Sequence, residues 1–310
     1  MGKIINIGSL NLDHVYQVDH FVLPGETTSA LSYAVNVGGK GLNQSIALAK
    51  AGAQVWHGGM LGTDGGMLSR ALEEAGVDVS WLRALPESCG HAVIQVNSQG
   101  QNCILLHGGT NRMLTREYVD QLLACAQPED VVLVQNETNL VDYIIERAAG
   151  LGLRVAMNAA PMGPEVCGYP LELLSWLVVN EVEGAQLTGV EDPTQVMERL
   201  TARYPDTAIV LTLGGDGVWY RDKDTQVRMG VCRIPHIVDT TAAGDTFLGY
   251  FLAGAVGGAA VEDALERATA ASALAIGRAG AAESIPTLKE VQAALADGIC
   301  QVPRLEAPAF

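Results

Sequence analysis

A chain of 310 residues is long enough for two ordinary domains, or for one large α/β domain with a smaller accessory piece. Hydrophobic residues make up 48% of it and charged residues only 17%, which excludes intrinsic disorder. The net charge of −16 argues against a general nucleic-acid-binding surface, so we expect no nucleic-acid partner. An anionic ligand would have to bind through a local feature such as a helix N-terminus.

The cysteines and the N-terminus narrow the class of protein further. The cysteines form no Cys-x-x-Cys pair, so we expect no structural zinc but reduced, mostly buried thiols at 89, 103, 125, 167, 232 and 300. Asn11 and Asp13 follow the first apolar residues too soon for a signal peptide. No apolar stretch approaches the ~18 residues of a membrane helix. We therefore expect a cytoplasmic protein with no membrane partner.

The elements of the main domain alternate between strands and helices. A buried strand at 4–7 is followed by a helix at 41–51, a strand at 54–57 and a helix at 64–75. Further apolar strands, with helical patterns between most of them, are expected at 131–134, 153–157, 176–179 and 208–211. Continuous apolar strands are buried on both faces. We therefore predict an α/β fold, a three-layer α-β-α sandwich around a mainly parallel sheet.

Two segments interrupt this alternation. Residues 12–36 alternate polar and apolar side chains without a helical period, and residues 90–110 have the pattern of a β-hairpin. We expect these two segments to form a small β-sheet lid outside the main sheet. The α/β core would then comprise residues 1–11, 37–89 and 111–310. The tail after residue 300 is expected to be loosely held.

The sequence Thr-Thr-Ala-Ala-Gly-Asp-Thr-Phe at 240–247 leads into a buried helix. Small residues just before a helix leave its first N–H groups open, which makes the helix N-terminus a site for phosphate oxygens. Asp245 lies in that first turn. It could merely complement the helix dipole, but a carboxylate beside a phosphate site is also suited to accept a proton from an attacking hydroxyl.

A second glycine-rich segment, Gly38-Gly39-Lys40-Gly41-Leu42-Asn43-Gln44, also precedes a helix. It is not a Walker P-loop, because Ala34 and Gly41 occupy positions where that motif needs Gly and Ser or Thr. Lys40 and Asn43 are three residues apart and share one side of a helical turn. Such convergent polar groups suit a hydroxyl-rich ligand, whereas the alternative is a glycine turn with a solvated lysine.

Three more polar groups follow buried strands, where ligands bind in such sheets. Asn11 and Asp13 follow the first strand and could hold two sugar hydroxyls, or form an Asx turn. Asn180 and Glu183 follow the strand at 176–179, where a helix N-cap is the alternative. Thr212 to Gly217 follow the strand at 208–211, where the alternative is a hairpin turn.

Together these motifs resemble the ribokinase-type carbohydrate kinases over about residues 3–290. Pro24–Thr27, His107–Asn111 and Glu137 fit the same pattern. The resemblance implies that the sugar is held by Asn11, Asp13, Gly39, Lys40, Asn43 and Glu137. It implies Asp245 as catalytic base and an anion hole at Ala242, Ala243 and Gly244. ATP would be bordered by Asn180, Glu183, Thr212, Gly214, Gly215, Gly217 and Gly244.

The resemblance also implies metal ions and an assembly. Magnesium would be bound through water by Glu183. A potassium ion would activate the enzyme from a site at Asp239, Thr241, Ala275, Arg278, Gly280 and Ser284. The lid would pair into a homodimer through apolar side chains at Val15, Val18, Val93, Ile94, Val96, Ile104 and Leu106.

The activity that the resemblance implies is ATP-dependent phosphorylation of the 5-hydroxyl of D-ribose to ribose 5-phosphate. The alternatives are a related kinase for another pentose, a ketose or a nucleoside, and a non-catalytic sugar-binding protein on the same scaffold. A nicotinamide-dependent dehydrogenase is disfavoured, because no Gly-x-Gly-x-x-Gly follows the first strand.

Overall fold

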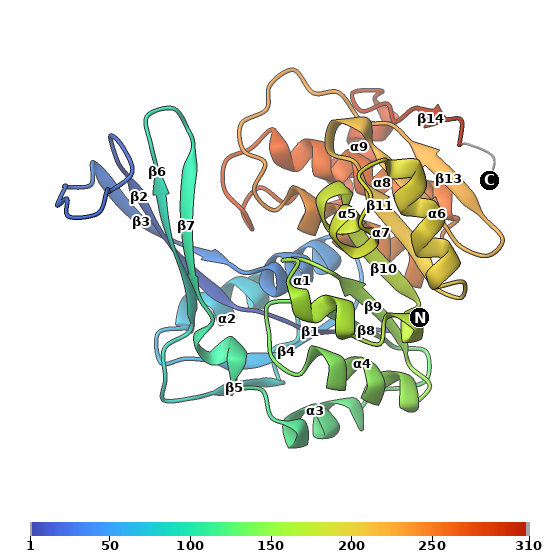
Figure 1. The fold of residues 1–310 in the computed structure, drawn as a ribbon, viewed down its shortest axis with the longest axis horizontal. Coiled ribbons are helices and arrows are strands. Elements are labelled where there is room, and N and C mark those ends of the chain that lie inside the picture. The colour runs from blue at the N-terminus through green and yellow to red at the C-terminus, as the bar shows by residue number, and fades with distance from the viewer. Residues whose placement is uncertain (1, 308–310) are drawn as a thin grey trace.

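A ten-stranded sheet forms the centre of the computed structural model, which describes residues 2–307. The strand order is β14-β13-β12-β11-β10-β9-β8-β1-β4-β5 (Figure 1). The strands from β11 to β5 in this order are parallel, and β12, β13 and β14 extend the sheet in antiparallel fashion. Their bounds are β1 Ile4–Ile7, β4 Val55–Leu61, β5 Leu82–Ala84, β8 Val131–Gln135, β9 Arg154–Asn158, β10 Trp176–Asn180, β11 Ala208–Thr212, β12 Val218–Arg221, β13 Gln226–Met229 and β14 Arg304–Leu305.

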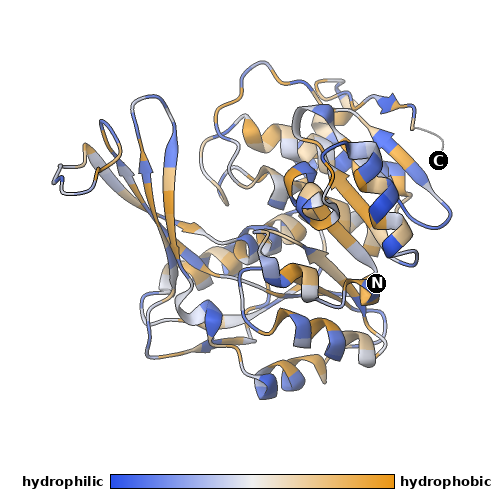
Figure 2. Ribbon diagram, in the orientation of Figure 1, coloured by the Kyte–Doolittle hydropathy of each residue, from blue (hydrophilic) through white to orange (hydrophobic). Residues whose placement is uncertain are grey.

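Helices cover both faces of this sheet and enclose two hydrophobic cores. Neighbouring residues of a strand point to opposite faces, so Ile4 belongs to one core and Ile5 to the other. The Ile4 core is covered by α1 Lys40–Lys50, α2 Gly66–Glu74, α7 Ala243–Val256, α8 Val261–Ile276 and α9 Leu288–Ala296. The Ile5 core is covered by α3 Arg116–Leu123, α4 Val141–Gly150, α5 Glu181–Thr188 and α6 Pro193–Arg203. The predicted three-layer sandwich is confirmed, and Figure 2 shows its hydrophobic central strands.

Short 3₁₀ helices connect several of these elements. Their bounds are η1 Gly109–Arg112, η2 Pro164–Gly168, η3 Leu171–Leu173 and η4 Gly214–Asp216. Within the Ile4 core, α1 and α7 approach closely at Gly249, where a Cβ atom would lie 2.4 Å from the Cβ of Ala47. A larger residue there would push the two helices apart. This contact holds the N-terminal turns of α1 and α7 beside each other at one edge of the sheet.

A second, four-stranded sheet stands away from the core (Figure 1). We call it the small sheet; its order is β3-β2-β6-β7, with bounds β2 Asn11–Gln17, β3 Ser32–Gly38, β6 Gly90–Val96 and β7 Asn102–His107. The expected lid segments therefore form one sheet. Its base is at Asn11, which is paired with both Gly38 and Gly90. Every residue of β7 is exposed.

The register divides the expected apolar residues between two faces of the small sheet. Paired residues of neighbouring strands share a face, and consecutive residues alternate. Val15, Ile94 and Ile104 therefore share one face with Asp13, together with Val96 and Leu106. Val93 is next to Ile94 and lies on the opposite face, so the expected residues do not all share one face. Val18 is buried beyond the end of β2, so it was wrong to count it among the exposed apolar side chains of the lid.

The expectation of reduced, mostly buried cysteines was wrong. Cys232 and Cys300 form a disulfide, and Cys103, Cys125 and Cys167 are exposed, whereas Cys89 is a buried free thiol. The disulfide forms because β14, shortly after Cys300, pairs with β13, shortly before Cys232. This pairing brings the two Cα atoms within 5.2 Å across 68 residues of sequence.

The C-terminal segment is also better anchored than expected. Strand β14 pairs with β13, and Gly230 N donates a hydrogen bond of 2.8 Å to Pro303 O. The expectation of a loosely held tail was therefore wrong up to Leu305. Within residues 2–307, no helix is long and apolar enough to cross a membrane.

Candidate active site

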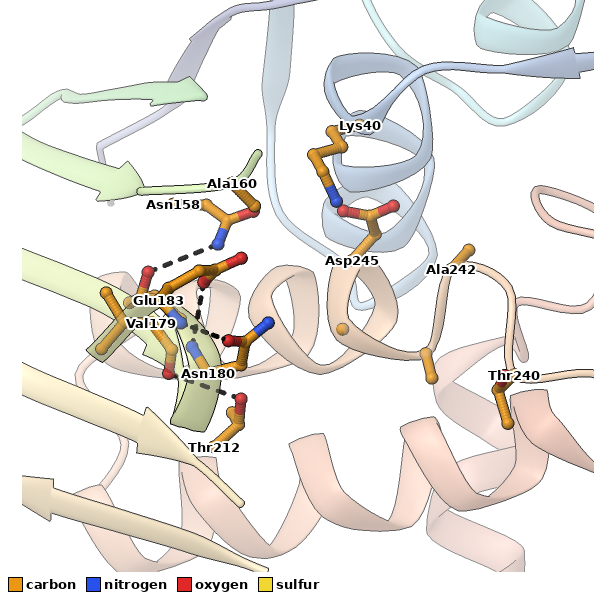
Figure 3. A pocket seen from close by; sticks show the side chains of 13 residues that line it. Lys40, Asn158, Ala160, Val179, Asn180, Glu183, Thr212, Thr240, Ala242 and Asp245 are labelled. Carbon is orange, nitrogen blue, oxygen red and sulfur yellow. Dashed lines mark hydrogen bonds between the residues drawn. The ribbon is translucent and has the colours of Figure 1, made fainter. Parts of the chain in front are cut away.

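A cavity of about 250 Å³ lies at the carboxyl ends of β9, β10 and β11, where they meet the N-terminal turns of α1 and α7 (Figure 3). This is the edge of a parallel sheet at which ligands bind. The cavity is lined by Lys40, Asn158, Ala160, Val178, Val179, Asn180, Glu183, Thr212, Thr240, Ala242, Ala243, Gly244 and Asp245. The structure thus brings together residues from motifs that are far apart in the sequence.

The first turn of α7 is open toward the cavity. Its N-cap residue is Ala242, in the left-handed conformation with φ of 58°, and no side chain caps the helix. A Cβ atom at Gly244 would meet no protein atom within 4 Å. Ala243 N donates to Thr240 O at 3.2 Å, whereas the N–H groups of Gly244 and Asp245 are available to a ligand, and the helix dipole favours a negatively charged one.

Asp245 is buried in this first turn and is held from two sides by α1. Its Oδ1 accepts a hydrogen bond of 2.8 Å from Gln44 Nε2, and its Oδ2 accepts one of 3.1 Å from Asn43 Nδ2. The side chain of Lys40 points toward the same carboxylate (Figure 3). The negative charge of Asp245, followed by those of Glu137 and Glu183, raises the pKa of Lys40 although burial opposes this. The cavity therefore holds a carboxylate with a protonated lysine beside it.

Glu137, which follows β8, connects the first strand to α1. Its Oε2 accepts hydrogen bonds from Ser9 Oγ and from the backbone N of Lys40, the latter at 3.0 Å. Ser9 Oγ also accepts a hydrogen bond of 3.1 Å from Gly41 N. These contacts fix one carboxylate oxygen of Glu137 and leave the other available to a ligand.

Asp13 is the most strongly perturbed acid of the site. Burial, followed by the charges of Glu137 and Glu283, raises its pKa to about 7. The absence of a side chain at Gly38 makes room for it, since a Cβ atom there would lie 2.1 Å from Asp13 Oδ2. A carboxyl group held close to other acids gains from a ligand that donates hydrogen bonds, as sugar hydroxyls do.

Asn11 and Asn43 offer amide groups beside these acids. Asn11 Oδ1 accepts a hydrogen bond of 2.7 Å from Asn111 Nδ2, which leaves the Asn11 amide hydrogens for another partner. Oδ1 of Asn43 is buried and has no partner among the described residues. Gly39 is the N-cap of α1 with φ of 94°, and a Cβ atom there would lie 3.0 Å from Asn11 N and 3.1 Å from Ser9 O. The predicted sugar residues therefore surround one region beside Asp245.

Asn180 and Glu183 both line the cavity and cap α5. Asn180 Oδ1 accepts a hydrogen bond of 2.8 Å from Glu183 N, and Glu183 Oε2 accepts one of 2.9 Å from Asn180 N. The alternative of a helix N-cap is thus confirmed as their local structure. Burial, the largest influence, raises the pKa of Glu183.

Thr212 lines the cavity, but the glycines after it do not. Gly214, Gly215 and Gly217 form the turn between the antiparallel strands β11 and β12, so the alternative of a hairpin turn is also confirmed. A Cβ atom at Gly217 would lie 2.0 Å from Met229 O, so the hairpin itself requires this glycine. Their location at the carboxyl end of β11 leaves them at the rim of the site.

The residues expected to bind a monovalent cation lie in two adjoining loops. Asp239 Oδ1 accepts hydrogen bonds from Thr241 N and Thr241 Oγ1, and Asp239 Oδ2 accepts one of 3.1 Å from Gly280 N. Burial would raise the pKa of Asp239, but these hydrogen bonds together lower it. Ala275 is at the end of α8, and Ser284 bonds within its own turn to Ala281 O.

Arg278 differs from the other expected cation-binding residues because its side chain is held in an ion pair with Glu290. Its guanidinium makes an ion pair of 2.7 Å with Glu290 Oε1 and so is engaged away from Asp239. The backbone of Arg278 remains in the loop, where its N donates to Ala275 O at 2.9 Å. Arg278 would therefore contribute a carbonyl oxygen and not its side chain.

Sequence reasoning assigned no role to Asn158 and Thr240, which line the cavity, or to Gln44, which contacts Asp245. Gln44 was noted only as part of a motif, yet it bonds directly to Asp245. Asn158 ends β9 and Thr240 precedes the α7 turn. The signal for Asn158 is the one that identified Asn180, a polar residue that ends a buried strand.

Comparisons with known proteins agree with this arrangement. A model of the pfkB family of carbohydrate kinases matches residues 1–288. The chain is 34% identical to a ribokinase of Haemophilus influenzae over 92% of this chain and 95% of that protein. It is 30% identical to a deoxyribokinase of Salmonella typhi, again over 92% and 95%. A solved ribokinase of Arabidopsis thaliana, complexed with ribose and ATP, matches 94% of this chain and 97% of its own with a TM-score of 0.83 and 27% identity. This chain therefore belongs to the pfkB family of carbohydrate kinases.

Proposed function

We propose that this protein is an ATP-dependent sugar kinase that phosphorylates the 5-hydroxyl of D-ribose to ribose 5-phosphate. One observation carries the proposal. The buried carboxylate of Asp245 lies in the uncapped first turn of α7, between amide donors from α1 and a cavity lined by the open turn Ala242–Gly244. This places a proton acceptor beside a phosphate site, as phosphoryl transfer requires.

The reaction follows from these positions. The sugar hydroxyl gives its proton to Asp245 while its oxygen forms a bond to the γ-phosphorus, and the bond from that phosphorus to the β-phosphate oxygen breaks to release ADP. The N–H groups of the α7 turn and the ammonium of Lys40 face the charge on the transferring group. Fixed donors of this kind stabilise the transition state because they need little reorganisation.

The sugar would be held beside Asp245 by the residues that surround that region. Asp13 and Glu137 would accept hydrogen bonds from its hydroxyls, and the Asn11 amide would donate one. The unpartnered Oδ1 of Asn43 would accept another, next to the Gly39 backbone. Bidentate acceptors fit vicinal hydroxyls, so ribose is favoured over 2-deoxyribose, which is the second candidate because a deoxyribokinase is 30% identical to the chain.

The cavity also suits the nucleotide and its magnesium ion. Asn180, Glu183, Thr212 and the glycine turn after β11 would border ATP. The capping box uses only Oε2 of Glu183, which leaves Oε1 for a magnesium-bound water, and magnesium commonly keeps several waters in such sites. Magnesium would supply charge neutralisation of the phosphates.

A potassium ion fits the loops at Asp239 and Gly280. Carbonyl oxygens of Thr241, Ala275, Arg278 and Gly280, with Ser284 nearby, are the hard ligands that such an ion accepts. When bound, the ion would neutralise Asp239 and steady the turn before α7. Potassium is therefore expected to raise both turnover and Tm, whereas sodium and a bulky organic cation should do less.

We further propose that the small sheet is a lid over the sugar and pairs with a second copy. Its Asp13 face carries Val15, Ile94 and Ile104, and Ile104 and Leu106 are about half exposed. A homodimer in which these faces cover each other would bury them. Light scattering should give about twice the mass of one chain.

Two substitutions in neighbouring residues test the lid pairing. Ile104→Asp places a charge on the proposed contact face and should dissociate the dimer and weaken sugar retention. Leu105→Asp is the control, because Leu105 is 71% exposed and lies on the opposite face of β7. If neither change alters the mass, the interface lies elsewhere; if only Leu105→Asp does, it is the other face.

A substrate panel tests the proposed activity. Purified protein with ATP and magnesium is given D-ribose, 2-deoxyribose, a ketohexose and a nucleoside, and ADP formation is followed. We expect the highest kcat/KM with D-ribose, and phosphorus NMR should place the new phosphate on the 5-oxygen. A higher kcat/KM with another acceptor would reassign the substrate. Tight sugar binding with no ADP formation would identify a binding protein.

A further inference from the structure

A chain of buried side-chain amides runs through the core behind Asp245. It consists of Asn6 on β1, Gln135 at the end of β8 and Gln44 on α1, all at most 1% exposed. The surrounding strand residues are apolar, since β8 reads Val-Val-Leu-Val before Gln135. Burying amides among such residues is unfavourable unless each is hydrogen-bonded. This series of amides ends at the Asp245 carboxylate. Its cost to folding therefore suggests a role for the amides at Asp245.

Gln135, in the middle of the series, donates hydrogen bonds to both of its neighbours, Asn6 and Gln44. Asn6 Nδ2 donates to Gly41 O and to Ser45 Oγ, both at 2.8 Å, so Asn6 Oδ1 is the acceptor for Gln135 Nε2 at 2.9 Å. Gln135 Nε2 gives its second hydrogen to Gln44 Oε1 at 2.7 Å. These bonds fix which end of the Gln44 amide faces Gln135.

The Gln44 amide must then present its NH₂ group to the active site. Gln44 Nε2 donates to Asp245 Oδ1 at 2.8 Å and to Asn158 Oδ1 at 3.1 Å. A rotated amide would place its oxygen against both acceptors and its NH₂ against that of Gln135. This is the only orientation of Gln44 that matches donors with acceptors, and in it a donor always faces Asp245, although Oε1 of Gln135 has no partner among the described residues.

We propose that Gln44 is a positioning residue that keeps Asp245 ionised and correctly turned for proton transfer, and that Gln135 fixes the orientation of Gln44. The proposal rests on the proposed role of Asp245 as catalytic base. A hydrogen bond from an amide to a carboxylate favours its charged form, which is the form that can accept a proton. The other charged groups facing Asp245 are Lys40, which also favours that form, and Glu183, which opposes it.

Two variants of Gln44 test the proposal. Gln44→Leu removes both donors at similar volume, and Gln44→Glu keeps the shape but replaces the NH₂ group by oxygen. We expect kcat to fall about 10- to 100-fold in each, with the KM for ribose within about threefold of wild type. The acidic limb of the kcat–pH profile should move up by about one pH unit.

Three further variants separate positioning from stability. Gln135→Leu should give a smaller shift in the same direction, and adding it to Gln44→Leu should cause little more, since both act through one bond. In an Asp245→Asn background, Gln44→Leu should not lower the residual rate. Thr207→Val is the control, because Thr207 is a buried hydroxyl bonded to Leu174 O far from the site. It should lower Tm without moving the pH profile.

The protonation of Asp245 can also be measured directly, without any kinase activity. Carbon NMR of labelled aspartate, assigned with Asp245→Asn, should show the protonation midpoint of Asp245 moving up in Gln44→Leu or, if that variant does not fold, in Gln135→Leu. An unmoved midpoint with kcat within twofold of wild type overturns the proposal, as does a raised KM at unchanged kcat. A wild-type protein without kinase activity would instead refute the proposed function, and the carbon midpoint would still decide the role of Gln44.

Discussion

Helices α5 and α7 both present their N-termini to the cavity, and they differ in how their first N–H groups are satisfied. Helix α5 has a full capping box, in which Asn180 and Glu183 bond to each other's backbone. Helix α7 begins at Ala242 with no side-chain cap and an open turn. A cap stabilises a helix by about 0.5–2 kcal/mol, and of these two helices only α5 has this contribution. Helices α1, α2, α4 and α8 also begin without a side-chain cap. What distinguishes α7 is that its open turn, Ala242 to Gly244, lines the cavity, so a ligand there can supply the missing hydrogen bonds.

Asp13 and Glu290 differ in the same way, in whether the protein itself supplies hydrogen-bond donors to the carboxyl group. Glu290 caps α9 by accepting hydrogen bonds from Thr287 N and Thr287 Oγ1, and these bonds lower its pKa to about 2. Burial raises the pKa of Asp13 to about 7. Glu290 is satisfied within the protein, whereas no hydrogen-bond donor is seen for the Asp13 carboxyl among residues 2–307, so a ligand can supply one.

The largest effect is expected at the open end of α7 itself. Asp245→Asn removes the proton acceptor but keeps the shape of the side chain, so we expect kcat to fall about 10²–10⁴-fold while ribose binding persists. Isothermal titration calorimetry measures ribose binding, and a discontinuous assay of ADP formation measures kcat. Turnover near the wild-type rate would show that another group accepts the proton.

A charged side chain in the open turn of α7 should raise the stability of the protein and lower its activity. Gly244→Asp places a carboxylate where a Cβ atom meets no protein neighbour, and a negative charge in the first turn stabilises a helix by about 0.3–1 kcal/mol. The same charge repels the transferring phosphate, so we expect kcat/KM for ATP to fall about 100-fold. Thermal unfolding with and without ATP measures both. A lower Tm together with normal ATP use would contradict the comparison.

Neutralising Asp13 should weaken sugar binding and stabilise the empty protein. The pKa of Asp13 is raised on folding, so its carboxyl destabilises the folded state increasingly as the pH rises from about 4 to 7. Asp13→Asn removes this effect, and its gain in Tm should therefore be larger at pH 8 than at pH 4. The KM for ribose should rise about 10- to 100-fold, because a hydrogen bond to a charged group is lost. A gain in Tm that is equal at both pH values would place the Asp13 carboxyl in contact with water.

The sequence predicted the parallel core and the clustering of its motifs, because polar residues that end apolar strands must meet at one edge of a parallel sheet. It did not predict β12, β13 and β14, whose short, half-polar strands lack a continuous apolar run. The disulfide was missed because only the pairing of β13 with β14 brings Cys232 and Cys300 together. Gln44 was part of a motif but was given no role. A polar residue in a predicted helix does not reveal which distant side chain it contacts, here Asp245.

The smallest effect is expected where a cap serves the fold alone. Thr287→Ala removes one half of the α9 capping box, far from the cavity lining, and should lower the free energy of unfolding by about 1 kcal/mol. Glu290 has a lowered pKa when folded, so its stabilising contribution is present above its unfolded pKa of 4.5 and is lost as the pH falls toward 2. Urea unfolding should therefore show a larger difference between wild type and Thr287→Ala at pH 7 than at pH 3. The kcat and both KM values should stay at wild-type levels, whereas Asn180→Ala, which breaks the same motif at the cavity, should lower stability similarly and also raise the KM for ATP. If Thr287→Ala impairs ATP use as much as Asn180→Ala does, the two caps do not differ in function and the contrast between them is wrong.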